Sequence, residues 1–252
     1  MAPQFLLPRW PAPPRVRATF TMRTGGVSLP PFDSLNLALH VGDDPAAVRE
    51  NRRLTRDALA LPAEPLWLQQ VHGTTVLNGD NPASPDLPAQ RADAAVTRSA
   101  GVVCCVLVAD CLPVLLAATD GSVIAAAHAG WRGLADGVLE NTVRAMDVAP
   151  NRLLAWLGPA IGPTRFEVGE EVRERFVLQD PSATAAFQPN DRGRWLADLA
   201  SLARQRLQGL GVTRIVAAEQ CTVCDPQKFF SYRRDGRCGR MAALLWLTDD
   251  AC

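Results

Sequence analysis

The segment VVCCVLVADCLPVLLAATDGSVIAAAH, residues 102–128, determines the architecture that we expect for this chain. It contains three apolar runs, and each has the length of a buried strand rather than of a helix. Asp120-Gly121 favours a hairpin turn between the last two runs. Asp110 and Pro113 interrupt the longest apolar stretch, so two buried strands fit it better than a membrane span does. The predicted strands cover residues 102–108, 113–118 and 122–127.

Strands and helices are mixed along the rest of the chain. Asp44-Pro45 is typical of a helix start, because a capping residue precedes a proline in the first turn. A Pro- and Asp-rich stretch, residues 79–88, is expected to be a surface loop. No linker is evident, so we expect a single α/β or α+β domain over residues 1–252. Further strands are predicted at 16–23, 66–71, 153–157, 214–218 and 240–247, and helices at 45–59, 130–146, 167–177 and 195–207.

Composition limits the class of protein. Hydrophobic residues make up 48% of the 252 residues, which is ample for a core. The formal net charge is zero and no basic stripe stands out, which argues against nucleic acid as the main partner. The prolines near the N-terminus leave no long apolar segment of the kind that secretory signals have. Seven cysteines, an odd number, then favour reduced thiols and a cytoplasmic location over a disulfide framework.

Three residues stand where predicted strands end: His72 in Gln-Val-His-Gly, Cys111 in Ala-Asp-Cys-Leu-Pro, and His128 in Ala-His-Ala-Gly-Trp-Arg-Gly. The chain has only three histidines, and two of them occupy equivalent positions. Two imidazoles and one thiolate on rigid supports suit zinc with an open fourth position, as in a catalytic site. We therefore predict that the fold brings these residues together around a metal ion.

Other chemistries use the same residues. They could be ordinary buried histidines and a core thiol, or a trigonal copper site with a long axial methionine. Cys111 could also act as a nucleophile with His128 as its base, which would favour acyl or amide hydrolysis. A multicopper oxidase is excluded, because three histidines cannot build its second, imidazole-rich copper cluster. The candidate axial methionines are Met1, Met22, Met146 and Met241.

Several residues are candidates for binding a substrate. Arg132 follows His128 at the start of a predicted helix, where backbone N–H groups and the guanidinium could hold phosphate or carboxylate. A structural ion pair would explain Arg132 equally well. Further candidates are Arg23, Arg52 and Arg53 for an anion and Tyr232 and Arg233 for a pocket, with surface or core roles as the alternatives. The pair Cys221 and Cys224 is interpreted as a turn with buried thiols rather than as a zinc or redox motif.

These segments together resemble the YfiH family, whose members are also described as laccase-domain or polyphenol oxidase proteins. The resemblance spans nearly the whole chain. It rests on the motifs TGGVS at 24–28, SLNLALHVGD at 34–43, QVHG at 70–73, ADCLP at 109–113, AHAGWRG at 127–133, LGPAIG at 157–162, CTVCD at 221–225 and FSYRR at 230–234. The resemblance implies an α+β single-domain sandwich, with two mixed β-sheets between helical layers.

The resemblance also implies a cytoplasmic zinc enzyme that acts on purine nucleosides. The implied reactions are phosphorolysis of adenosine, inosine and methylthioadenosine, and deamination of adenosine. The family's metal ligands carry over onto His72, Cys111 and His128, and Asn36 and His40 become pocket candidates. Some members are linked to peptidoglycan editing. Where many members carry Cys after the proline that follows the 157–162 motif, here Pro163, this chain has Thr164.

We therefore predict a zinc-dependent purine nucleoside phosphorylase with adenosine deaminase activity, copper being the alternative metal. Asp110 is the nearest carboxylate in sequence to Cys111, so it joins Cys111 and His128 as a candidate catalytic residue. The expected partners are a nucleoside and phosphate, without nucleic acid or membrane, and the expected state is a monomer or weak oligomer. The alternatives are an amidase-like factor that edits peptidoglycan precursors and a metal-dependent binding or regulatory protein.

Overall fold

The structure is a computed structural model that describes residues 2–81 and 89–249. The apolar segment forms three strands, β5 (Val103–Val108), β6 (Leu112–Ala118) and β7 (Ile124–Ala129). β6 and β7 pair as an antiparallel hairpin, but β5 belongs to a different sheet. The chain crosses between the sheets at Asp110, which has a left-handed φ of 87°. The predicted strands are confirmed, and the metal-ligand candidate Cys111 lies at this crossing.

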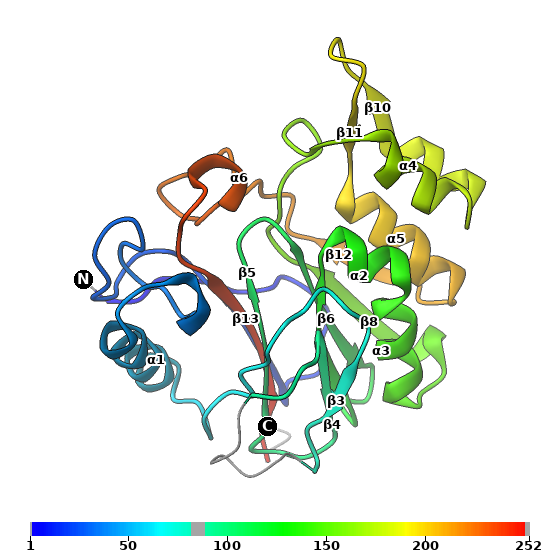
Figure 1. Cartoon of the computed structure of the whole chain (residues 1–252). Coiled ribbons are helices and arrows are strands. Elements are labelled where there is room, and N and C mark those ends of the chain that lie inside the picture. The colour runs from blue at the N-terminus through cyan, green and yellow to red at the C-terminus, as the bar shows by residue number, and fades with distance from the viewer. Residues whose placement is uncertain (1, 82–88, 250–252) are drawn as a thin grey trace.

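Two large sheets face each other (Figure 1). The six-stranded sheet has the order β12-β8-β6-β7-β4-β3 and is mixed, because β12 pairs with β8 and β3 with β4 in parallel. The four-stranded sheet has the order β1-β2-β13-β5 and is antiparallel throughout. The remaining bounds are β1 Phe5–Leu6, β2 Val16–Thr21, β3 Val76–Asn78, β4 Ala94–Thr97, β8 Leu153–Leu157, β12 Arg214–Ala217 and β13 Met241–Leu247.

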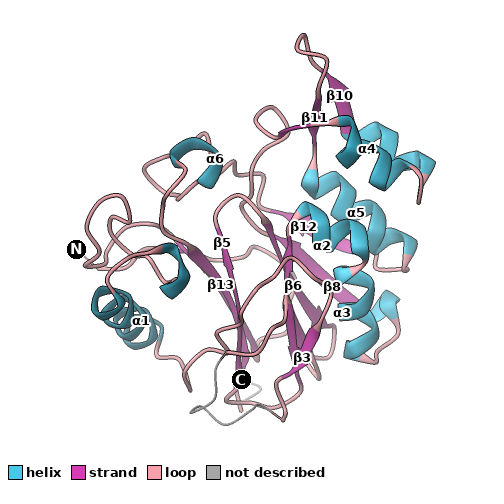
Figure 2. Ribbon diagram, in the orientation of Figure 1, coloured by secondary structure: helices cyan, strands magenta, loops and turns pink. Residues whose placement is uncertain are grey.

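Alternating side chains divide the interior into three layers. In β5, Cys104 and Val106 face the six-stranded sheet, whereas Cys105 and Leu107 face the opposite side, toward α1 (Pro45–Leu59). Each strand therefore contributes to two cores. The outer face of the six-stranded sheet is covered by α2 (Trp131–Asp136), α3 (Val138–Met146) and α5 (Leu199–Gly209). Helices thus flank both sheets (Figure 2), which confirms the predicted α+β sandwich, although only one of the two sheets is mixed.

Some predicted elements differ from the observed ones. Residues 66–71 do not form a strand, and their sheet pairing is limited to isolated bridges at Leu66 and Gln69. The helix predicted over 130–146 is divided into α2 and α3 by Gly137, whose φ of 99° is left-handed. The predicted loop at 79–88 lies mostly outside the described residues.

The two remaining predicted helices each begin with a strand instead. β9 (Glu167–Val168) precedes α4 (Glu170–Val177), and β11 (Trp195–Ala197) precedes α5. With β10 (Phe187–Pro189) these strands make a third, antiparallel sheet. Asp198 caps α5 by accepting a hydrogen bond from the Ser201 amide, so helical geometry cannot extend back to Trp195. Short helices complete the chain: Leu39–Val41, Pro150–Arg152, Pro181–Ala186 and α6 (Tyr232–Asp235).

Helix α1 has the predicted bounds and the predicted Asp44 cap. Its buried face is partly polar, because Asn51 is fully buried whereas Ala58 is exposed. The Asn51 amide donates to Ser28 Oγ and to two backbone carbonyls, and its Oδ1 accepts from the Val27 amide. The helix therefore holds the loop at residues 27–36 through hydrogen bonds. Among the described residues, no helix is both long and apolar enough to cross a bilayer.

The core between the two sheets depends on Trp156 in β8, which is 2% exposed and lies edge-on to Phe20, with ring centroids 6.5 Å apart. We expect Trp156→Ala to lower the free energy of unfolding by about 3–5 kcal/mol, because the sheets cannot fully collapse into the cavity. Urea denaturation measures this change. Leu178→Ala is the control: Leu178 is 85% exposed, so its change should stay within about 0.5 kcal/mol. Equal effects of the two substitutions would contradict this assignment.

Candidate metal centre

The structure brings His72, Cys111 and His128 together from three separate segments. His72 Nε2 lies 3.8 Å from Cys111 Sγ, and the two imidazole centroids are 4.8 Å apart. The three candidate ligand atoms all lie within 4.8 Å of one another. Within residues 2–81 and 89–249, this is the one group of three or more His, Cys, Asp or Glu residues with metal-binding spacing. The predicted juxtaposition is therefore present.

One buried carboxylate orients both imidazoles. Asp93 Oδ1 accepts a hydrogen bond from His128 Nδ1 at 2.9 Å, which leaves His128 Nε2 for the centre. The same carboxylate accepts from the amides of Val71, His72 and Gly73 at 2.8–3.1 Å. These bonds hold His72 in a left-handed conformation with φ 59°. Asp93 is fully buried, so its charge acts on these groups without screening by water.

Two further contacts fix the shape of the centre. Gln70 clamps the backbone of Leu107 in β5, because its Nε2 donates to the carbonyl at 2.8 Å and its Oε1 accepts from the amide at 2.7 Å. This clamp holds the segment that carries His72 against β5. Gly130 lies directly beside the ligands: a Cβ there would be 2.9 Å from His72 Cδ2 and 3.1 Å from Cys111 Sγ. A side chain at position 130 would therefore press on the ligand atoms.

The centre favours a charged thiolate and a charged imidazole. Burial would raise the pKa of Cys111, but His128 and His72 outweigh it by charge and hydrogen bonding and lower the pKa to about 6. Burial would likewise lower the pKa of His128, yet Cys111 and Asp93 raise it to about 9. Asp93 keeps a pKa below its usual range, since hydrogen bonds from His128, Gly73 and Val71 overcome the cost of burial. A cation in place of the protons would be stabilised by the same charges.

The three residues open onto a cleft of about 350 Å³. Its size lies in the range of small-molecule sites. His72 is exposed toward it, whereas His128 is buried. Polar groups around it come from His40, Gln70, Tyr232 and Arg240, and apolar ones from the end of β5. The residues that line it are His40, Gln70, His72, Leu107, Val108, Ala109, Cys111, His128, Tyr232 and Arg240.

Two of the predicted substrate residues line this cleft, namely His40 and Tyr232. The pKa of His40 is lowered by partial burial and by the charges of Arg240 and Arg52, so its ring is neutral at pH 7. The Tyr232 side chain is 61% exposed at the start of α6. An exposed aromatic ring beside polar groups suits the face of a flat heterocyclic ligand.

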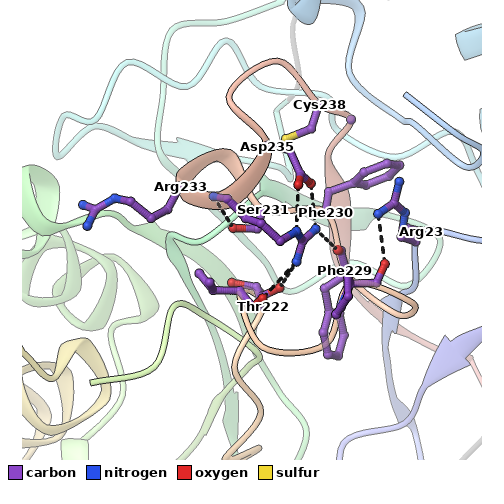
Figure 3. Close-up of polar contacts among 12 residues, drawn as sticks. Arg23, Thr222, Phe229, Phe230, Ser231, Arg233, Asp235 and Cys238 are labelled. Carbon is purple, nitrogen blue, oxygen red and sulfur yellow. Dashed lines mark hydrogen bonds and ion pairs between the residues drawn. The ribbon is translucent and has the colours of Figure 1, made fainter. Parts of the chain in front are cut away.

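Other predicted site residues have their side chains in structural contacts. The Asp110 carboxylate accepts from Thr222 Oγ1 at 2.5 Å, Ser231 Oγ at 3.0 Å and the Arg233 amide at 2.6 Å, rather than lining the cleft. Figure 3 shows the Arg233 side chain directed away from Ser231 and Thr222. The Arg233 guanidinium instead donates to the carbonyls of Arg165 and Glu167.

The remaining predicted residues also lie outside the cleft lining. Asn36 is buried, and its side chain bonds to the backbone of Ala38 and Arg240 and to Asp43. The other four are arginines with local partners. Arg23 pairs with Asp33, Arg52 donates to the Leu37 carbonyl and lies over the Trp67 ring, Arg53 pairs with Glu50 and Asp57, and Arg132 lies over the Trp131 ring.

Three residues that we did not predict take part in the site: Asp93, Gln70 and Arg240. Asp93 lies 35 residues before His128 in the sequence, so no local pattern connects the two. Gln70 belongs to the QVHG motif, but the sequence did not indicate a role for its side chain. A signal for Asp93 does exist, since metal-bound histidines commonly donate their second ring nitrogen to a carboxylate.

The donor set fits a borderline or soft cation, because it combines two imidazole nitrogens with a thiolate that the site already favours. None of the described methionines completes a trigonal copper site. Met241 Sδ accepts a hydrogen bond from the Phe230 amide, and Met146 packs in the core beneath the helices. Met1 lies outside the described residues, and no described methionine lines the cleft. The centre therefore offers a cation three ligands, two imidazole nitrogens and one thiolate sulfur.

Comparison with known proteins gives consistent results. A sequence model of the family described as multi-copper polyphenol oxidoreductase laccase matches residues 17–248. The chain is 52% identical over 247 residues to the Escherichia coli (strain K12) protein named purine nucleoside phosphorylase YfiH, covering 97% of this chain and 99% of that protein. It is also 52% identical over 248 residues to a purine nucleoside phosphorylase of Pseudomonas aeruginosa, with the same coverage of each chain. The crystal structure of a Neisseria meningitidis protein superposes with a TM-score of 0.92 at 47% identity, covering 97% and 99% of the two chains.

Asp93 should control metal affinity without being a ligand. We expect Asp93→Asn to weaken zinc binding about 10–100-fold, because the amide holds His128 and the 71–73 amides less strongly. Chelator competition measures the affinity, with Cys111→Ala as the variant that loses a ligand. Asp80→Asn is the matched control, since Asp80 also accepts several backbone amides, those of Arg98 and Ser99. An unchanged affinity in Asp93→Asn would refute this role.

The metal-free centre should show a reactive thiolate. After chelation, we expect the rate of Cys111 alkylation by iodoacetamide to rise through a midpoint at pH about 6, because the thiolate forms above that pKa. In His128→Asn the midpoint should move up toward the ordinary thiol pKa of about 8.5. Mass spectrometry of the modified peptide follows the reaction. A midpoint near pH 8.5 in the chain without substitutions would contradict the pairing of the Cys111 thiolate with the charged His128 imidazole.

Proposed function

This chain belongs to the multi-copper polyphenol oxidoreductase laccase family, and we propose that within it the protein acts as a zinc-dependent purine nucleoside phosphorylase. Relatives that share about half of its residues over nearly their whole length carry that name. The observation that carries the proposal is the His72, Cys111 and His128 set at the base of a cleft large enough for a small molecule. Adenosine, inosine and methylthioadenosine are the proposed substrates.

Zinc is the metal of the proposal. Two imidazole nitrogens and one sulfur with an open position suit zinc. Copper is less well supported, because the chain has three histidines in total and no described methionine lines the cleft. When bound, zinc supplies a Lewis acid at the base of the cleft. His72, Cys111 and His128 would hold it, and Asp93 would keep the His128 ring in the tautomer that presents Nε2.

The chain's own residues supply groups for both parts of the substrate. Tyr232 offers an exposed ring for the purine face. Arg240 is the cation that lines the cleft, and its Nη1 is held by the carbonyls of Cys238 and Gly239. A guanidinium fixed in this way suits a phosphate. Neutral His40 lies in the same lining and can donate or accept a hydrogen bond at pH 7.

Asp110 takes a different role from the one predicted. Its carboxylate already accepts three hydrogen bonds from the segment 222–233, so we assign it to positioning that segment, which carries Tyr232, beside Cys111. Arg132 is exposed and stacks on Trp131, so we give phosphate binding to Arg240 instead. The predicted catalytic role remains with Cys111 and His128 through the metal that they hold.

Deamination of adenosine is the second reaction of the proposal. In that reaction water replaces the amino group at purine C6. The support is the ligand chemistry, because zinc deaminases that act on nucleobases also combine histidine and cysteine ligands. Both reactions place a purine at the same cleft, so both should require Cys111, and both should lose activity in the same proportion when Cys111 is changed.

The test is incubation of the zinc-loaded protein with each nucleoside and phosphate. We expect phosphate-dependent release of the free base and ribose 1-phosphate, and formation of inosine from adenosine, both followed by liquid chromatography. Cys111→Ala should abolish both reactions together with zinc binding, while Asp80→Asn should retain them. Zinc binding without product from any nucleoside would reject the enzyme assignment and favour a metal-dependent binding protein.

A pair of arginine variants tests the phosphate site within the same assay. Arg240→Gln should raise KM for phosphate about tenfold or more at unchanged zinc content, because a charge-assisted contact of about 1.5–3 kcal/mol is lost. Arg132→Ala should leave that KM unchanged. The reverse pattern would return phosphate binding to Arg132.

A further inference from the structure

Cys221 and Cys224 form a pair of thiols that the metal centre does not use. They follow β12 at a turn, three positions apart in the sequence. Cys224 is exposed and Cys221 is half-buried, so the prediction of a turn with buried thiols is wrong for this pair, whereas Cys104, Cys105 and Cys238 are buried. The packing of the core therefore does not require either sulfur of the pair. Both are placed where a solute can reach them.

Hydrogen-bond donors surround this pair. The Gly162 amide donates to Cys221 Sγ at 3.2 Å. Arg165, from the same loop after β8, acts on Cys224 through its positive charge. The pKa of Cys224 is lowered by its hydrogen bonds to Cys221 and Arg165, while burial raises the pKa of Cys104 to about 12 and also raises that of Cys238. The environment thus favours a nucleophilic thiolate at Cys224 over the buried thiols.

The pair lies beside a second cleft, of about 320 Å³, which Cys221 lines together with Gly162 and Thr164. This cleft is separate from the one at the metal centre, because the two share no lining residue. It lies beyond the carboxyl ends of the parallel strands β8 and β12. Its walls include the apolar side chains of Leu112 and Ile161. A small oxidant with an apolar part can therefore rest in this cleft beside Cys221, and Cys224 is reached from solvent.

A second metal site does not fit here. A closed zinc site needs four ligands, and an open one needs three. Across the described parts of the chain, neither thiol belongs to a group of three or more His, Cys, Asp or Glu residues with metal-binding spacing. Thr222, one of the two residues between them, has a structural role, because its hydroxyl donates to Asp110. The turn is therefore anchored, and its two sulfurs remain available for chemistry with each other.

We propose that Cys221 and Cys224 form a redox-active dithiol that is oxidised by organic hydroperoxides, with Cys224 as the attacking sulfur and Cys221 as the resolving one. The Cys224 thiolate attacks the distal peroxide oxygen, so that an S–O bond forms, the O–O bond breaks, and an alkoxide leaves and takes up a proton as an alcohol. Cys221 then attacks the sulfenic sulfur of Cys224, which forms the S–S bond and releases hydroxide, protonated to water. In sum, two thiols are oxidised and one hydroperoxide is reduced to alcohol and water.

Tryptic mapping tests this directly, because residues 215–228 form one tryptic peptide that contains both sulfurs and no other cysteine. The full zinc-loaded protein is treated with cumene hydroperoxide, alkylated and digested without reductant. We expect the 215–228 peptide to lose two hydrogens and to resist alkylation, before the Cys111 peptide changes. Cys221→Ser should instead accumulate a sulfenic acid at Cys224 that dimedone traps.

A second measurement isolates the environment of Cys224. Arg165→Gln should slow its alkylation at pH 7 about three- to tenfold, since less thiolate is present. Arg144→Gln, at another exposed arginine, should leave the rate unchanged. Two results would overturn the proposal: a 215–228 peptide that stays reduced while Cys111 oxidises, or Cys224 alkylation in the folded chain no faster than in the isolated peptide. Neither measurement depends on purine nucleoside activity.

Discussion

The Asp93 carboxylate is the contact on which the candidate site depends. It is fully buried and accepts hydrogen bonds from the His128 ring and from the amides of residues 71–73. A buried negative charge is costly unless it is fully hydrogen-bonded, and here the compensating donors are the two segments that carry the imidazoles. The hydrogen bonds that compensate for the burial of Asp93 are therefore the same ones that hold the two imidazoles in place. The segment with His72, which forms no strand, gains its order from this carboxylate and from the Gln70 clamp on β5.

Much of the fold could be predicted because the apolar runs are short and end in turn residues. β6 and β7 followed from the runs around Asp120-Gly121, and α1 followed from Asp44-Pro45. The strands at 167–168 and 195–197 could not be predicted, since two or three residues carry no period that separates a strand from the first turn of a helix. The burial of Asn51 and the exposure of Ala58 could not be predicted either, because Asn51 is buried through hydrogen bonds to a distant loop.

The candidate site shows the same division. His72, Cys111 and His128 could be predicted from rare residues at the ends of apolar runs, although only the fold brings them together. Arg240 could not, because it reaches the cleft through the pairing of β13 with β5, two strands that are far apart in sequence. Arg132 was the natural choice from the sequence, since it lies four residues after His128. The helical backbone instead places its guanidinium over the Trp131 ring, at the surface.

The family is described as multi-copper oxidoreductases, but the histidines and cysteines of this chain favour two other kinds of chemistry. A multicopper oxidase needs a second, imidazole-rich copper cluster. The chain has three histidines, and two of them are already at one centre, so one imidazole is left for the rest of the chain. That remaining residue, His40, lies in the lining of the same cleft. The cysteines with access to a cleft or to solvent lie at two separate places. Cys111 lies beside two imidazoles, where a cation would stabilise its thiolate. Cys221 and Cys224 lie beside an amide and a guanidinium, and among the described residues they have no third ligand with which to hold a metal ion. The first arrangement favours Lewis-acid chemistry on a bound substrate. The second arrangement favours oxidation of the thiols by a peroxide, because two neighbouring thiols without a metal can be oxidised through a sulfenic acid to a disulfide.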